Sequence, residues 1–62
     1  MSVLVKRLLV WIGKNPGKQG KQVPRQLRDE LRRCEVDDLI DYDTGVGWSL
    51  TERGEQAVQQ IN

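Results

Sequence analysis

The chain has 62 residues, a net charge of +1, one cysteine and no histidine. A chain this short supports one domain (residues 1–62) with a small core, since it buries only about 60% of the surface that it exposes when unfolded. The single cysteine, Cys34, excludes an internal disulfide bond and is typical of a reducing compartment, so we expect a cytoplasmic protein. Structural zinc sites of the ordinary type need more cysteine and histidine ligands than this, and we expect no cofactor.

The first predicted element is a helix over residues 2–12. Ser2 can cap its first turn through the hydroxyl group, and residues 13–17, with two glycines and a proline, end it. Apolar residues recur at offsets of three, four and seven, which places them on one face. They are Val5, Leu8, Leu9 and Ile12.

The apolar run Val3–Ile12 is too short to span a membrane, which takes about 20 apolar residues. Lys6 and Arg7 also interrupt it, so we expect a core helix and no membrane partner. Eight of its ten positions are apolar. This is more apolar surface than one small core covers, and it favours a homodimer as one hypothesis.

A polar loop over residues 14–22 follows, and a second helix is predicted from Pro24 to Cys34. Proline is favourable at a first helical position, where its missing N–H has no partner to lose. Leu27, Leu31 and Cys34 form the apolar stripe of this helix. The arginines lie three and four apart on a different face. They are Arg25, Arg28 and Arg32, with Arg33 beside them.

The last third of the chain predicts a hairpin and a helix. Residues 39–42 form a short strand, Asp43-Thr44-Gly45 a turn in which glycine tolerates positive φ, and residues 46–50 the returning strand. Thr51 caps a final helix over residues 52–61, whose apolar positions are Ala57, Val58 and Ile61. The predicted fold class is therefore α+β.

The stretch from Leu39 to Val58 resembles the end of a winged helix-turn-helix domain. The resemblance lies in Leu39-Ile40-Asp41-Tyr42, in a glycine-bearing wing at residues 43–47, and in Trp48, Leu50, Thr51 and Gly54 before the last helix. It implies a small winged-helix-like domain, ordered as helix-loop-helix, two-stranded hairpin and C-terminal helix. A full winged domain carries three helices before the hairpin. Either residues 18–23 form a degenerate helix, or one element is missing.

The resemblance implies a small DNA-binding protein of bacterial or phage type, a transcriptional regulator with one helix in the major groove of double-stranded DNA. Arginine can bind guanine or phosphate with two parallel hydrogen bonds, and glutamine can bind adenine in the same way. Lysines on the loop would contact phosphate without reading sequence. The implied contacts are Arg25, Gln26, Arg28, Arg32 and Arg33 on the helix, and Lys14, Lys18 and Lys21 on the loop.

Charge is distributed unevenly, which keeps other interpretations open. Residues 1–33 carry nine basic residues against two acidic ones, a net +7, and residues 34–62 carry one basic residue against seven acidic ones, a net −6. The arginines could therefore be a solvated face balanced by nearby acids. The wing has no lysine or arginine, which favours an alternative function as a protein-protein interaction module, an inhibitor or adaptor without DNA binding.

No enzyme is expected from these residues. Cys34 lies on an apolar stripe and fits a small buried hydrophobic residue better than a nucleophile. The pair Asp37-Asp38 has no accompanying residues that would form a catalytic pocket. Trp11 and Trp48 are expected in the core, because so short a chain needs large apolar anchors.

Overall fold

The computed structural model of the protein describes residues 2–61, and the predicted apolar side chain of Ile61 lies outside the described part. The expected α+β arrangement is confirmed: helices, a two-stranded antiparallel hairpin and a C-terminal helix. In chain order the elements are α1 (Val3–Lys14), the 3₁₀ turn η1 (Gly20–Gln22), α2 (Arg25–Arg28), α3 (Leu31–Val36), β1 (Ile40–Asp43), β2 (Gly47–Leu50) and α4 (Glu52–Ile61).

Helix α1 buries the whole predicted apolar stripe, whose four members are at most 4% exposed. The hydroxyl of Ser2 accepts the N–H of Val5 at 3.1 Å, as expected of a cap. The helix runs two residues further than predicted, because Gly13 stays helical instead of ending it. Asn15 closes the helix: its side-chain amide donates to the carbonyl of Trp11 at 2.9 Å.

The prediction of one helix from Pro24 to Cys34 is wrong, because the structure divides this stretch into α2 and α3. The N–H of Glu30 binds the carbonyl of Leu27, three residues back, at 3.1 Å. Such 3₁₀-type bonds tighten the chain and interrupt the α-helical ladder. The ladder resumes when the N–H of Cys34 binds the carbonyl of Glu30 at 3.0 Å. Pro24 stands one residue before α2, not at its first position.

The division of that helix resolves the question of the missing element. Within residues 2–61, α1, α2 and α3 now precede the hairpin, which is the number a winged domain carries. Residues 18–23 contribute only the single turn η1. The extra helix therefore comes from the predicted second helix and not from the loop before it.

Strands β1 and β2 pair with Ile40 opposite Leu50 and Tyr42 opposite Trp48. The turn carries its positive φ at Gly47 (+104°) and not in the predicted Asp43-Thr44-Gly45. A Cβ atom at Gly47 would lie 2.7 Å from the backbone of Gly17 and Lys18, so glycine lets the loop approach the hairpin. Lys18 forms a β-bridge to Trp48, which places this loop beside β2 as a short third strand.

The hairpin joint, residues 38–54, fixes the hairpin to both neighbouring helices. Thr51 caps α4 as predicted: its hydroxyl accepts the N–H of Gly54 at 3.0 Å and donates to the carbonyl of Asp38. A Cβ atom at Gly54 would lie 1.9 Å from the carbonyl oxygen of Leu39, so the predicted close packing at this glycine is confirmed. Asp38 itself has φ +60°. The N–H of Leu39 reaches back to the carbonyl of Cys34 at 2.9 Å, which is the Schellman way of ending a helix.

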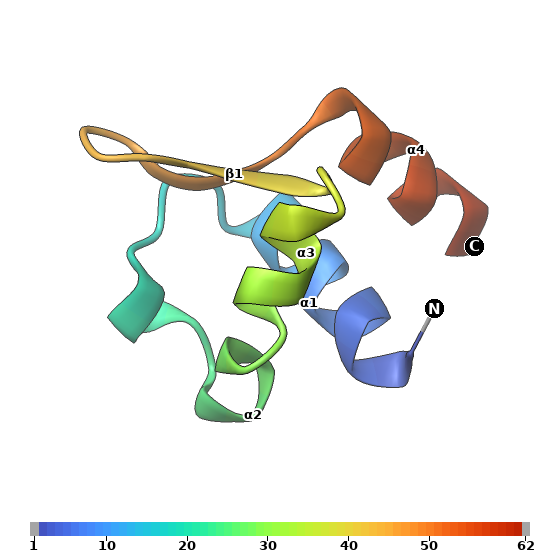
Figure 1. Cartoon of the computed structure of the whole chain (residues 1–62), viewed down its shortest axis with the longest axis horizontal. Coiled ribbons are helices and arrows are strands. Elements are labelled where there is room, and N and C mark those ends of the chain that lie inside the picture. Colours follow the sequence, from blue (N-terminus) through green and yellow to red (C-terminus); the bar gives the residue numbers. More distant parts are fainter. Residues whose placement is uncertain (1, 62) are drawn as a thin grey trace.

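Helix α1 lies at the centre of the arrangement and contacts α2, β2 and α4. Figure 1 shows the hairpin extending across one side of the helices, with η1 and α2 on the opposite side. The buried residues from α1, α2, α3 and β1 form one core, against which Trp11 and Trp48 pack as expected. No helix among the described residues has the length and apolar character needed to cross a membrane.

Candidate nucleic-acid interface

The eight predicted contact residues lie on one continuous stretch, residues 14–33, which we call the basic segment. It covers the end of α1, the loop with η1, α2 and the start of α3. Seven of the side chains are exposed and that of Lys18 is half-buried. In chain order they are Lys14, Lys18, Lys21, Arg25, Gln26, Arg28, Arg32 and Arg33.

The break between α2 and α3 changes how the arginines are displayed. Arg25 and Arg28 belong to α2, whereas Arg32 and Arg33 belong to α3. The single arginine stripe predicted for a continuous helix is therefore wrong. The arginines occupy two short helices joined through Asp29 and Glu30, a helix-turn-helix unit in which the second helix presents Arg32 and Arg33 in its first turn.

Arg28 is held by the protein backbone. Its Nε donates to the carbonyl of Val23 at 2.9 Å, and its Nη2 donates to the carbonyl of Lys21. These two bonds fasten the chain around η1 to α2, so Arg28 positions Lys21. Sequence periodicity placed Arg28 with the other exposed arginines, and nothing in the sequence pattern distinguishes it from them.

Helix α3 is anchored by its apolar side. Cys34 is fully buried in the core, and Leu31 packs against the core from a half-buried position. Burial, followed by the nearby carboxylates of Glu30 and Asp37, raises the pKa of the Cys34 thiol to about 11. A thiol protonated at neutral pH is a poor nucleophile, which agrees with the predicted role as a small hydrophobic residue.

The loop that carries Lys18 is fixed against the hairpin. Lys18 and Gly17 exchange backbone hydrogen bonds with Trp48, both of 2.9 Å. The hydroxyl of Tyr42 donates to the side-chain carbonyl of Gln19. Tyr42 also packs edge-on against Trp48, with ring centroids 4.9 Å apart. The basic segment is therefore tied to the hairpin on one side and to the core on the other. Gln19 was not predicted to have this role.

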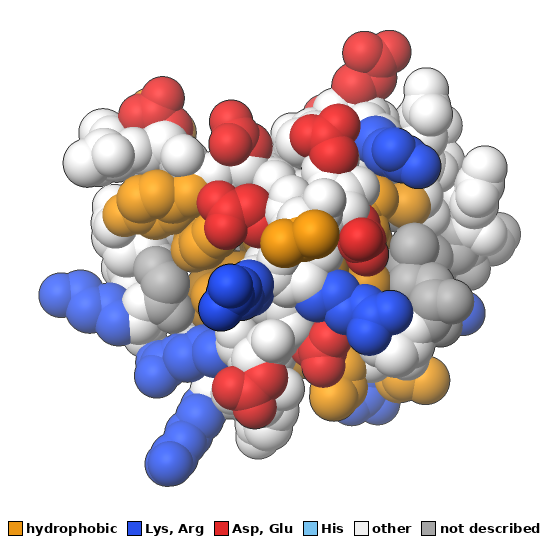
Figure 2. Space-filling model, in the orientation of Figure 1, with side chains coloured by type: hydrophobic (Ala, Val, Ile, Leu, Met, Phe, Trp, Pro, Cys, Tyr) orange, Lys and Arg blue, Asp and Glu red, His pale blue; other side chains and the backbone are white. Residues whose placement is uncertain are grey.

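The cations of the basic segment are not paired with the protein's own acids. Within residues 2–61, no lysine or arginine nitrogen lies within 4.0 Å of a carboxylate oxygen. Figure 2 shows Lys and Arg side chains towards the left and lower part of this face, and carboxylates mainly above them towards the hairpin and α4. Asp29 and Glu30 do place two carboxylates within the segment. The basic surface is thus interrupted, but its charges remain available to a partner.

The hairpin carries the opposite charge. Asp41 and Asp43 are both exposed, and Asp43 spends one carboxylate oxygen on the N–H of Gly45 at 2.9 Å. Val46, at the tip, is 59% exposed. A surface of this kind repels phosphate, so any contact with nucleic acid falls to the basic segment.

Comparison of the chain with profiles of known protein families, with curated protein sequences and with solved structures finds no match.

Proposed function

We propose that this protein binds double-stranded DNA through the basic segment, with α3 in the major groove and the lysines of the loop on phosphate, and that it acts as a small transcriptional regulator. One observation carries the proposal: the basic side chains are exposed, stand on a two-helix unit and form no ion pairs within residues 2–61. Unpaired exposed cations are the groups that phosphate contacts require.

The two kinds of contact divide between the elements. Arg32 and Arg33 lie in the first turn of α3, the part of a recognition helix that reaches base edges. Lys18 and Lys21 precede α2 on backbone that is fixed by the hairpin and by Arg28, which suits contacts to the sugar-phosphate chain. The proposed role places the protein in the cytoplasm, where the buried Cys34 thiol would stay reduced.

The test is a titration of labelled duplex DNA at rising salt concentrations. Binding through released counterions makes the logarithm of the affinity fall linearly with the logarithm of salt, by about 0.9 per neutralised phosphate. Arg32→Gln/Arg33→Gln should weaken binding and reduce that slope by about 1 to 2. Arg53→Gln, the same change on an exposed residue of α4, is the matched control and should leave both unchanged.

Two results would refute the proposal. The first is the absence of measurable duplex binding at about 50 mM salt, where phosphate contacts are strong. The second is an equal loss of affinity in the Arg53→Gln control, which would show that only the total charge of the protein matters.

A protein-protein interaction module is the second candidate function. It is favoured by the hairpin tip, where exposed acidic residues flank an exposed Val46, since charge around an apolar contact is typical of protein interfaces. Asp41→Lys/Asp43→Lys would abolish binding to a basic protein partner, whereas the Arg32→Gln/Arg33→Gln variant would retain it. The two variants therefore separate the two functions.

A further inference from the structure

Helix α1 has a second apolar surface besides the one it buries in the core. Val3 is 63% exposed and Leu4 is 39% exposed. Val10 and Trp11, on the next turns of the same helix, are only half-buried. The excess of apolar residues noted in the sequence is therefore visible at the surface, along a helix that also carries the cations Lys6, Arg7 and Lys14.

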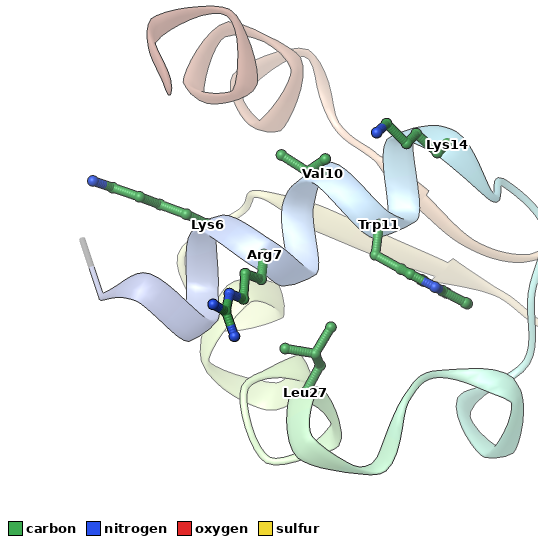
Figure 3. Close-up of a pocket in the computed structure, with 6 residues that line it drawn as sticks. All are labelled: Lys6, Arg7, Val10, Trp11, Lys14 and Leu27. Carbon is green, nitrogen blue, oxygen red and sulfur yellow. The ribbon is translucent and has the colours of Figure 1, made fainter. Parts of the chain in front are cut away.

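Part of this surface is a groove between α1 and α2, with a volume of about 390 Å³. Figure 3 shows Trp11 projecting from α1 and Leu27 from α2 towards the space between the two helices. Its lining consists of three apolar and three basic side chains and includes no acidic residue. They are Val10, Trp11 and Leu27, with Lys6, Arg7 and Lys14 around them.

The lining specifies the chemistry of an occupant. An apolar floor gains free energy by burying apolar side chains, at about 25 cal/mol per Å². The surrounding cations favour carboxylates at the edges of the contact. Apolar residues on one side and acids beside them describe an amphipathic acidic helix, which binds grooves of this kind through residues spaced three and four apart. Duplex DNA would use the cations and leave the aliphatic floor without a partner.

A second copy of this chain is a poor occupant. In a symmetric dimer the same patch meets itself, so Lys6, Arg7 and Lys14 would face their own counterparts. The acidic helix α4 could not enter the groove of another copy with its apolar side, because Ala57 and Val58 already pack against the core.

We propose that the groove between α1 and α2 is a docking site for an acidic amphipathic helix of a partner protein. The site is separate from the proposed contacts of α2 and α3 with DNA, except for Lys14, and it does not depend on them. Trp11 and Leu27 receive the apolar side chains of the partner, and the three cations receive its carboxylates.

The experiment uses a fluorescent peptide of about 18 residues, five turns of helix, with leucine at every third or fourth position and glutamate beside the leucines. A peptide of the same composition in scrambled order is the reference. Fluorescence anisotropy with the full chain should show saturable binding of the amphipathic peptide, at least tenfold tighter than that of the scrambled one.

Lys6→Glu/Arg7→Glu reverses two exposed charges at the groove and should weaken peptide binding about tenfold. Lys21→Glu/Arg53→Glu changes the net charge equally on exposed residues outside the lining and should change it less than twofold. Circular dichroism of both variants checks that they remain folded.

Three results would overturn the proposal. One is equal affinity for the amphipathic and scrambled peptides, and another is an equal loss of affinity in the two double variants. The third is sedimentation of the free protein as a dimer that Lys6→Glu/Arg7→Glu dissociates, which would assign the groove to a second copy.

Discussion

The hairpin joint and the basic segment are built in opposite ways. In the joint, each conserved distance is set by a close contact: Gly54 lies against the backbone of Leu39, and the hydroxyl of Thr51 bonds on both sides. In the basic segment, two helices of four and six residues carry exposed charged side chains, and Val23, Leu27 and Cys34 are its main buried anchors or lie directly beside it.

This difference separates stability from recognition. Residues of the joint have their hydrogen bonds and contacts satisfied inside the protein, so changing them should affect folding. Most cations of the basic segment have no partner inside the described chain, so changing them should affect binding and leave folding nearly intact. Arg28 is the exception, because it bonds to the backbone. The following predictions test this division, beginning with the largest expected effect.

Gly54→Ala should have the largest effect on stability. Its Cβ atom would lie 1.9 Å from the carbonyl oxygen of Leu39, and backbone cannot move aside as a flexible side chain can. We expect a loss of at least about 3 kcal/mol, measured by thermal denaturation. Gly45→Ala is the control, because its Cβ would meet only Asp43 Oδ1, at 3.6 Å. Equal melting temperatures for the two variants would contradict the assignment.

Thr51→Ala should lower the free energy of unfolding by about 1–2 kcal/mol, the usual cost of losing a helix cap. The variant leaves the N–H of Gly54 without its acceptor and the carbonyl of Asp38 without its donor. Urea denaturation measures the loss. Thr51→Ser keeps the hydroxyl group and should retain most of the stability; a serine variant as unstable as the alanine one would show that the methyl group matters instead.

The two regions also differ in how well the sequence predicts them. The joint follows from short-range rules, because Thr51 is a favourable cap and a glycine three residues later permits close packing; both predictions are confirmed, as are the bounds of α4. The basic segment misled the periodicity argument. Leu27, Leu31 and Cys34 are spaced as on one helix, yet a single 3₁₀-type bond at Glu30 divides the segment, and spacing does not register such a bond.

Side-chain partners in the candidate interface were predictable only in part. Exposure of the cations follows from their position opposite the apolar stripe. The bonds from Arg28 to Val23 and Lys21, and from Tyr42 to Gln19, depend on how η1 folds back on α2 and on the hairpin. These are tertiary contacts between residues that no local pattern relates. Function itself remains a proposal from charge and geometry.

Cys34 provides a test through pH. Burial raises the pKa of its thiol from 9.0 to about 11, so the native state holds the proton more tightly than the unfolded state. Stability from this group is complete below pH 9 and is lost as the pH rises from 9 to 11, by at most about 1.4 kcal/mol per pH unit. The slope of unfolding free energy against pH in this range should be less steep in Cys34→Ala. Identical slopes would mean that the thiol is not buried in this way.

Asp38→Gly should stabilise the protein by about 0.5–1 kcal/mol. Asp38 has φ +60°, where a side chain is strained and glycine is not, and its hydrogen bond from Thr51 uses only the backbone carbonyl. Asp37, one residue earlier, has φ −80°, so Asp37→Gly offers no such relief and should be neutral or destabilising. A less stable Asp38→Gly variant would show that the carboxylate contributes more than the strain costs.

Arg32→Gln/Arg33→Gln should have the smallest effect on stability, within about 0.5 kcal/mol for each residue. Both side chains are exposed and lack an acid within 4.0 Å among residues 2–61, so their removal leaves nothing unsatisfied in the fold. The same variant should lose affinity for duplex DNA, and urea denaturation alongside the titration compares the two properties directly. A stability loss as large as that of Thr51→Ala would place these arginines among the residues that hold α3 in position. The contrast between a joint that maintains the fold and a segment free to bind would then fail.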